Sequence, residues 1–215
     1  MEKFDLKKAY KALYSAPTGA FSVIDVLPIN YFMIDGSGDP NTAAEYKTAV
    51  EALYTASYTL KFMSKAVLQR DYVVPPLEGL WWSDDMTDFT TRRKERWHWR
   101  MMIAVPDFVK RSMVGEAISK AIEKKGSLAL QRLRLERLEE GQAVQTLHIG
   151  SYDNEGPILK RLHQEFLPAN GFAPSGHHHE IYLSDPRKTA AERLKTLLRQ
   201  PVSPDSLPSD ASRAE

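Results

Sequence analysis

The sequence predicts an α+β fold built from two copies of a βαββ module. Hydrophobic patterns in the first half of the 215 residues follow the order strand, helix, strand, strand, and a similar order follows in the second half. Both halves contain an apolar strand, a Gly/Ser/Asp break and then a helix, as YFMIDGSGDP and as TLHIGSYDNEGP. We therefore expect two modules, 21–106 and 107–186, related by a pseudo-twofold axis and built on antiparallel sheet.

In the first half, strand-forming residues occupy positions 21–35. Pro28 divides this run because proline cannot donate to a ladder, which leaves 29–35 as the expected strand. Glycines and Pro40 then end the strand. The other elements expected in this half are a helix from about 42 to 65 and strands within 72–82 and over 96–105.

In the second half, helix-like and strand-like hydrophobic patterns again follow one another. A helix over 107–124 ends at Gly126, a residue typical of helix C-termini. The elements expected after it are strands over 130–138 and 142–149, a helix over about 155–166 and a strand over 177–184. Outside the modules we expect an N-terminal helical extension (1–20), a C-terminal helix (187–200) and a disordered tail rich in proline and serine (201–215).

Composition excludes several classes of protein. The 29 basic and 28 acidic residues give a formal charge of +1, which argues against a nucleic-acid binder. The absence of cysteine excludes disulfides, thiolate metal sites and a cysteine nucleophile, and no apolar run approaches the length of a membrane span. We expect a cytoplasmic monomer or homodimer that uses no cofactor and binds neither nucleic acid nor membrane.

Three segments carry a resemblance to a known family: YFMIDGSGDP (31–40), LEGLWW (77–82) and HEIYL (179–183). Over about residues 20–186 the chain resembles the GyrI-like small-molecule-binding family. The resemblance implies two βαββ modules and an aromatic groove with a buried glutamate that meets cationic or aromatic ligands. We expect no counterpart of the helix-turn-helix found in the transcription factors of this family, because about 20 residues precede the first strand.

The LEGLWW segment is most similar to a stand-alone branch that includes cyclopropanoid cyclopropyl hydrolases. These enzymes add water to open the strained ring of DNA-alkylating natural products. The resemblance implies a cofactor-independent hydrolase that acts in detoxification or self-resistance.

Side chains alternate along a strand, so Glu180 shares a face with His178 and Tyr182, opposite His179. Such a pattern suits a sheet with helices on one side and a groove on the other. The same rule places Glu78 and Trp82 opposite Trp81, although Pro75 and Pro76 leave open which tryptophan faces the groove.

Four tryptophans lie within nineteen positions: Trp81, Trp82, Trp97 and Trp99. One interpretation is ordinary core, since aromatic side chains bury large areas. The other is a slot that stacks on a planar or positively charged ligand. We expect these four residues, with Tyr31, Tyr182 and His179, to contact such a ligand.

The glutamates provide the expected chemistry. Glu180, with Glu78 as a partner, would orient and deprotonate a water that attacks an activated cyclopropane. Tyr152, Tyr182 or His179 would stabilise the oxyanion that forms. The alternative is that both glutamates lie at a strand edge in water.

Other site classes lack support. His177, His178 and His179 alternate sides of a strand without an H-E-x-x-H pattern, so we expect no metal site. The Gly36–Gly38 break matches no phosphate-binding motif, and no serine lies in G-x-S-x-G. Three functions therefore stay open: the hydrolase, a non-catalytic multidrug-type binding or sequestering protein, and a gyrase-inhibitor-like interaction protein.

Overall fold

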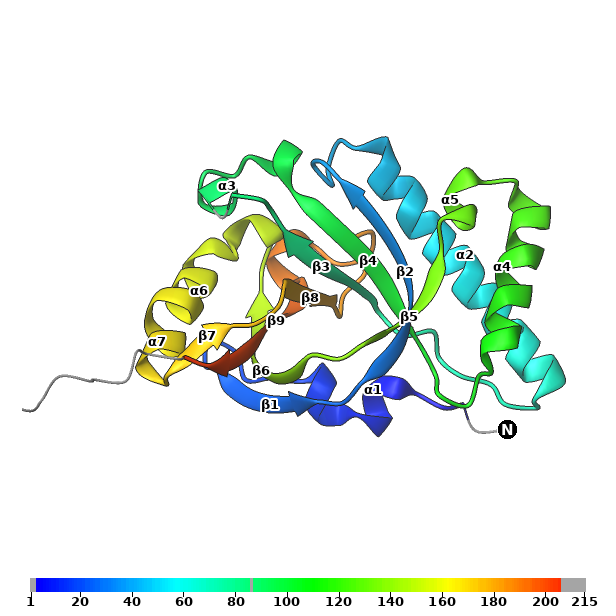
Figure 1. Cartoon of the computed structure of the whole chain (residues 1–215), viewed down its shortest axis with the longest axis horizontal. Helices are drawn as coiled ribbons and strands as arrows, with labels where there is room; N and C mark the ends of the chain where they lie inside the picture. Colours follow the sequence, from blue (N-terminus) through cyan, green and yellow to red (C-terminus); the bar gives the residue numbers. More distant parts are fainter. Residues whose placement is uncertain (1–2, 86, 206–215) are drawn as a thin grey trace, which may run out of the picture.

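The chain forms one large antiparallel sheet with helices on both of its faces (Figure 1). The computed structural model describes residues 3–85 and 87–205. The strands lie in the order β1-β6-β9-β8-β3-β4-β2-β5, and β7 also pairs with β9. Their bounds are β1 Ser22–Val26, β2 Ile29–Ser37, β3 Leu77–Trp82, β4 His98–Val105, β5 Arg134–Leu138, β6 Gly141–Ile149, β7 Phe172–Pro174, β8 His178–Tyr182 and β9 Lys195–Pro204.

The pairing pattern reads alike from either edge of the sheet. The run β5-β2-β4-β3 from one edge corresponds to β1-β6-β9-β8 from the other, and the two runs meet where β3 pairs with β8. We call this junction the β3–β8 seam. The α+β class and the antiparallel sheet are confirmed, whereas the duplication of a sequence module stays a prediction.

Most of the helical structure covers one face of the sheet, which we call the helical face. Helix α2 (Ala44–Val67) packs there on β2 and β4, and α4 (Arg111–Lys125) and α5 (Leu128–Gln131) pack beside α2. Nearer the other edge, α6 (Gly156–Arg161) continues through a π-helical turn, Leu162–Phe166, into α7 (Leu167–Ala169). The π-helical turn and α7 pack against β6 and β9.

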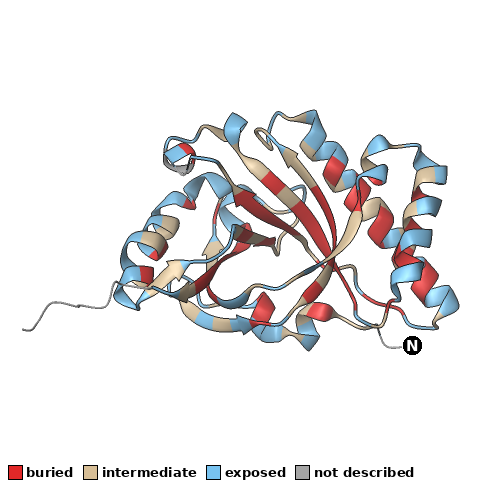
Figure 2. Ribbon diagram, in the orientation of Figure 1, coloured by how far each residue is buried: buried red, intermediate tan, exposed pale blue. Residues whose placement is uncertain are grey.

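The N-terminal segment closes the opposite face. It contains α1 (Leu6–Ala9) and a 3₁₀ turn, Lys11–Tyr14, which pack on apolar side chains of β2, β3, β4, β6, β8 and β9. Figure 2 shows the result: the central strands are buried, and exposed residues gather on the outer helices and the periphery. The central strands therefore carry near-continuous apolar runs, in which Phe32 and Ile34 face the helices and Tyr31 and Met33 face the N-terminal segment.

The expectations for the C-terminal region are wrong. Residues 187–200 form a 3₁₀ turn, Ala191–Arg193, and then β9 instead of a helix, and 201–204 belong to β9 instead of a tail. Because β9 pairs with both β6 and β8 and is buried on both faces, its sequence shows no alternation that marks a strand. The rest of the predicted tail, 206–215, lies outside the described residues.

Two other boundaries shift for local reasons. The strand expected within 72–82 begins at Leu77, after Pro75 and Pro76, which cannot donate to the ladder. The strand expected at 130–138 begins at Arg134, because α5 occupies the preceding residues.

Gly36 is required by the packing of Trp99. Gly36 and Trp99 are paired across β2 and β4, and a Cβ built at Gly36 would lie 2.1 Å from Cη2 and 2.3 Å from Cζ2 of the indole. We expect Gly36→Ala to lower the free energy of unfolding by about 1–3 kcal/mol, because a fully buried ring cannot move aside at no cost. Urea denaturation measures this change.

Gly115 is the matched control, because it lies within α4 and a Cβ there meets nothing within 4 Å. Gly115→Ala should raise the free energy of unfolding by about 0.5–1 kcal/mol. Equal stability of Gly36→Ala and the wild-type protein would contradict the close packing described for Trp99.

Candidate functional site

Two groups of polar side chains lie at the β3–β8 seam, on opposite faces of the sheet. In the ladder Gly79 pairs with Glu180, and Glu78 pairs with Ile181. Because paired residues share a face and neighbours alternate, Glu180 faces the helices while Glu78 faces the N-terminal segment. The two glutamates therefore do not form a pair in one groove, and this expectation is wrong.

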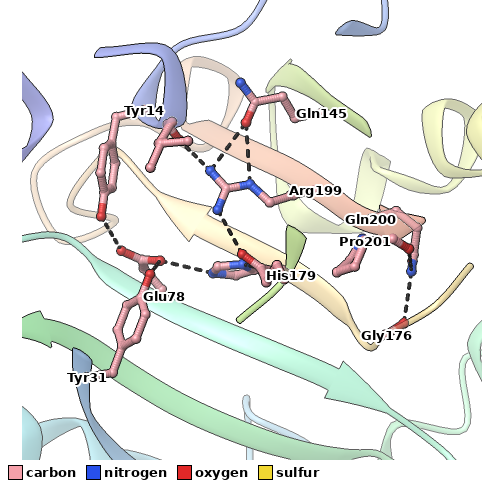
Figure 3. Close-up of polar contacts among 11 residues, drawn as sticks. Tyr14, Tyr31, Glu78, Gln145, Gly176, His179, Arg199, Gln200 and Pro201 are labelled. Carbon is pink, nitrogen blue, oxygen red and sulfur yellow. Dashed lines mark hydrogen bonds and ion pairs between the residues drawn. The ribbon is translucent and has the colours of Figure 1, made fainter. Parts of the chain in front are cut away.

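The group beneath the N-terminal segment is a chain of buried charges, which we call the charge network (Figure 3). The Nε2 of His179 lies 3.0 Å from Glu78 Oε2, and its Nδ1 lies 2.9 Å from Glu140 Oε1. The side chain of Arg199 continues the chain with Nη1 3.1 Å from Glu140 Oε2. The network thus alternates negative and positive groups across β3, β8 and β9.

Hydrogen bonds with neighbouring groups satisfy the polar atoms of Glu78 and Arg199 at the two ends of the network. Tyr14 and Tyr31 donate their hydroxyl hydrogens to the two oxygens of Glu78, at 2.9 Å and 3.1 Å. Arg199 also donates to the carbonyl oxygen of Leu13 at 2.5 Å and to Oε1 of Gln145. A buried carboxylate with several such donors needs no ligand to be satisfied.

The network shifts the ionisation of its members. Burial opposes charge on His179, yet the charge of Glu140 and hydrogen bonds to Glu140 and Glu78 raise the pKa of His179 above its usual value. Burial likewise opposes charge on Glu140, but His179 and Arg199 lower the pKa of Glu140 to about 2. The imidazolium and the carboxylate therefore stabilise each other.

Four residues predicted to act at one site belong to this face instead. Glu78, His179 and Tyr31 are buried in the charge network. Trp82 stacks on His177, with ring centroids 4.4 Å apart, on the same face. These four residues lie on the face opposite Glu180, so the structure does not bring them together with Glu180 in one groove.

The second group, on the helical face, we call the carboxyl–aromatic cluster: Trp81, Tyr152, Glu155, Glu180 and Tyr182. The hydroxyl of Tyr182 donates to Glu180 Oε2 at 2.8 Å and accepts from the indole Nε1 of Trp81 at 3.0 Å. The ring of Tyr152 meets that of Tyr182 edge-on, with centroids 5.6 Å apart. The side chain of Glu180 is 14% exposed, so water can reach it.

Aromatic side chains of α2 and β4 extend the cluster. Tyr46 of α2 contacts the rings of both Trp81 and Trp99, with centroid distances of 6.1 Å and 5.3 Å. Trp97 meets Trp81 edge-on at 5.9 Å. Trp99 is fully buried and Trp81 is also buried in the same apolar cluster, whereas Trp97 is half-buried. The core interpretation is therefore right for Trp99.

The expected arrangement of helices and site on opposite sides of the sheet is also wrong for Glu180. Trp81 and Tyr182 pack in the same apolar cluster as α2, which places Glu180 on the helical face. On the other face, the N-terminal segment packs over Tyr31 and Glu78.

Several buried polar atoms of the helical face lack a hydrogen-bond partner among the described residues. They include Oε1 of Glu155, Oγ1 of Thr196 and both ring nitrogens of His178. Thr196 pairs with Tyr182 across β9 and β8, and His178 precedes Glu180 by two residues on the same face. Such atoms are normally satisfied, so their clustering here marks a polar region of the interior beside Glu180.

The cluster also changes the acidity of its members. Burial and the nearby Glu180 charge raise the pKa of Tyr152 to about 12 and that of Glu155 to about 10. Tyr152 is therefore a neutral hydroxyl donor at physiological pH, and Glu155 carries a proton.

Ion pairs join the segment between β3 and β4 to the 3₁₀ turn that precedes α6, beside the carboxyl–aromatic cluster. Lys94 lies 3.1 Å from Asp153 Oδ1, and Arg92 forms an ion pair with the same carboxylate and donates to the Asp153 carbonyl at 3.0 Å. Asp153 directly follows Tyr152 in a 3₁₀ turn. The ion pairs thus tie a first-half segment to the second half beside the carboxyl–aromatic cluster.

A separate cavity of about 340 Å³ lies at the ends of β2, β3 and β4. Its described lining is largely acidic and includes Asp84, Asp85, Asp88 and Glu95. Arg93 neutralises Asp88 at 2.7 Å. None of the predicted site residues lines this cavity, and no group of side chains suited to hold a metal ion occurs in the described part of the chain.

Glu155, Tyr46 and Thr196 are not among the site residues expected from the sequence. Tyr46 lies in the helix expected over about 42–65, and Thr196 lies in the segment 187–200 that the sequence predicts to be helical. Glu155 lies at the start of the helix expected over about 155–166, and its one local signal is its place beside Gly156-Pro157 at the helix entry.

A family model described as "GyrI-like small molecule binding domain" matches residues 20–203. The chain belongs to the GyrI-like family. The match includes β9, so the family domain extends beyond the limit of residue 186 expected from the sequence.

Solved structures agree with this assignment. An uncharacterised conserved protein from Listeria innocua is 41% identical, with 94% of this chain and 100% of that chain covered and a TM-score of 0.83. A structure described as a hydrolase from the same organism is 40% identical with equal coverage and a TM-score of 0.80. The C-terminal domain of EcmrR, 12% identical with a TM-score of 0.55 over 86% of this chain and 98% of that chain, shares the fold alone.

No protein of curated function matches the chain. Within the described residues, no helix of this GyrI-like protein is both long enough and apolar enough to cross a membrane.

The charge network makes folding sensitive to Glu140. Glu140→Gln leaves His179 and Arg199 buried without their carboxylate, so we expect the free energy of unfolding to fall by about 3–5 kcal/mol. The folded-state pKa of Glu140, about 2, lies below its ordinary 4.5. Its contribution is therefore present above that ordinary value and is lost as pH falls toward about 2. Chemical denaturation at several pH values measures both effects.

Glu139→Gln is the control, because Glu139 is exposed and pairs only with Arg137 at 3.4 Å among the described contacts. It should change stability by less than about 0.5 kcal/mol. If Glu140→Gln were as stable as Glu139→Gln, the charge network would not hold the seam together.

Proposed function

We propose that the carboxyl–aromatic cluster is the small-molecule site of this GyrI-like protein, and that it hydrolyses planar compounds that carry an activated cyclopropane. The observation that carries the proposal is Glu180, a partly exposed carboxylate held by Tyr182 among aromatic rings at the seam. We assign the role of general base to Glu180 alone, because Glu78 lies on the other face of the sheet.

In the proposed reaction Glu180 removes a proton from water as the water oxygen bonds to the cyclopropane methylene carbon. The ring C–C bond breaks, and its electron pair moves through the conjugated system to the carbonyl oxygen. Tyr152 supports the oxyanion with its hydroxyl, since burial keeps this group protonated, and solvent then protonates the product. The proton held by Glu180 returns to solvent, which restores the carboxylate.

Among the three expected oxyanion donors, Tyr152 is the best placed. Its side chain is 38% exposed beside the cluster, whereas the Tyr182 hydroxyl hydrogen is already donated to Glu180. His179 is buried in the charge network on the opposite face. We assign to Trp81, Trp97 and Tyr46 the stacking that orients the ligand, which reduces the entropy lost in reaching the transition state.

The relatives support hydrolysis in general terms. Two structures of Listeria innocua proteins, each 40% identical over 94% of this chain, are described as hydrolases. We propose that the corresponding activity here detoxifies DNA-alkylating compounds, without a cofactor.

A second candidate is a protein that binds planar or cationic molecules and releases them unchanged. The description of the family as a small-molecule-binding domain favours this function. The same cluster would serve both functions, so turnover is the measurement that separates them.

We expect the wild-type protein to convert more than one equivalent of a conjugated spirocyclopropane, followed by loss of its ultraviolet chromophore. Glu180→Gln should reduce the rate about 10²–10⁴-fold, because it removes the base and keeps the shape. Glu165→Gln, at an exposed residue of the π-helical turn, is the matched control and should keep the full rate.

Ligand binding is followed in the same samples by quenching of tryptophan fluorescence. Quenching with an intact ligand would leave the binding protein as the function. A rate that Glu180→Gln does not change would remove Glu180 from the mechanism.

A further inference from the structure

Glu155 is a second carboxyl group on the helical face that the proposed reaction does not use. It directly precedes α6, is only 4% exposed, and its Oε1 has no hydrogen-bond partner among the described residues. The backbone N–H of Glu155 donates to the carbonyl of Tyr152 at 3.4 Å, so the two residues belong to one turn. A buried, unpartnered carboxyl is costly unless it is protonated or meets a cation.

The groups around Glu155 are mostly acidic or neutral. Glu180 of β8 and Asp153 of the preceding turn are close enough to act on its charge, with Lys94 from the opposing segment and the Thr196 hydroxyl of β9. Lys94 already lies 3.1 Å from Asp153, and that pair is part of the tie across the seam. The nearby positive charge is therefore already engaged.

Four groups lie around Glu180, from β8, from α2 and from the turn that precedes α6. Tyr182 donates to Glu180, His178 lies 3.6 Å from it on the same strand, and Tyr46 of α2 and Tyr152 face it as neutral hydroxyls. His163, beyond His178, has its pKa lowered to about 4 by burial and by His178. Two carboxylates in such surroundings cannot both be ionised at low cost.

Burial also limits what Glu155 can do. Its Oε1 is inaccessible, so it cannot touch a ligand directly, whereas Glu180 is partly exposed. Any effect of Glu155 on a ligand must act through charge over a short, poorly screened distance. The aromatic rings of Trp81 and Tyr46 next to Glu180 are surfaces on which a planar cation can stack.

We propose that Glu155 and Glu180 form a carboxyl pair that holds one proton in the ligand-free protein and releases it when a planar organic cation binds beside Glu180. This inference rests on the proposed ligand site but not on its hydrolytic activity. Cation binding is thereby coupled to pH, whereas the binding of a neutral ligand of the same shape is not.

The size of the coupling follows from the charges. A cation within about 4–6 Å lowers a carboxyl pKa by roughly 1–3 units. The pKa of Glu155, raised by burial and Glu180 to about 10, would thus fall to roughly 7–9 in the complex. The cation binds more tightly as pH rises through this interval, because fewer protons remain to be displaced.

The test compares N-methylphenanthridinium, a permanent cation, with neutral phenanthridine, which has the same ring system. Affinities come from tryptophan quenching between about pH 7.5 and 9.5, above the usual pKa of histidine and below that of Tyr152. We expect the affinity of the cation to rise roughly 3- to 60-fold and that of phenanthridine to stay constant. Calorimetry in buffers of different ionisation enthalpy should show between about 0.2 and 0.9 proton released per bound cation at about pH 8.5.

Glu155→Gln resembles the protonated acid in shape and charge, so it should fold and bind both probes. It should lose the pH dependence and the proton release. The proposal is overturned if the wild-type protein binds both probes with no pH dependence, or if Glu155→Gln keeps the slope. If neither probe quenches tryptophan, the ligand site itself is wrong, and the proposed function fails with it.

Discussion

The ion pairs between Glu78, His179, Glu140 and Arg199 hold the two halves of the sheet in register. They cross the seam from β3 to β8 and continue to β9, and the hydroxyls of Tyr14 and Tyr31 close one end. A one-residue slip of β3 at the seam would move Glu78 to the face that now holds apolar side chains. It would also move those apolar side chains to the face that Glu78 now occupies. The position of Glu180 on the helical face therefore depends on a network that lies on the other face.

Because side chains of β3 and β8 alternate between the two faces of the sheet, the charge network and the carboxyl–aromatic cluster lie directly opposite each other. Beneath the N-terminal segment, each carboxylate has cationic or hydroxyl partners, and Glu140 is strongly acidic. On the helical face, Oε1 of Glu155 has no partner among the described residues, and the Thr196 hydroxyl and Lys94 do not offset burial and the charge of Glu180, so Glu155 is a weak acid. The same residue type is thus structural on one side and available for ligand chemistry on the other, because the partners differ.

Much of the fold could be predicted from sequence, because local signals agree with the structure in particular places. Glycines and Pro40 end β2, Gly126 ends α4 in the left-handed conformation, and strand alternation places Glu180 with Tyr182 and His178. The faces of Trp81 and Trp82 also follow from alternation once the start of β3 is known.

The rest depended on contacts between distant segments. Alternation shows that Glu78 and Trp81 are opposite, but only the pairing of β3 with β8 shows that Glu180 lies on the side of Trp81. The strand β9 is buried on both faces and has no alternating pattern, so its sequence was interpreted as helix. Glu155 was missed because its unusual acidity comes from burial and from a residue 25 positions later in the chain.

The place of β9 in the sheet also has a consequence for biosynthesis. It follows the other strands in the chain but lies between β6 and β8, and it carries Arg199 into the charge network. While the preceding strands emerge from the ribosome, β1 and β6 have no ladder that connects them to β8 and β3. The nascent sheet therefore exists as two separate pieces with open edges, and translation of this late strand both joins them and removes two surfaces on which nascent chains could aggregate.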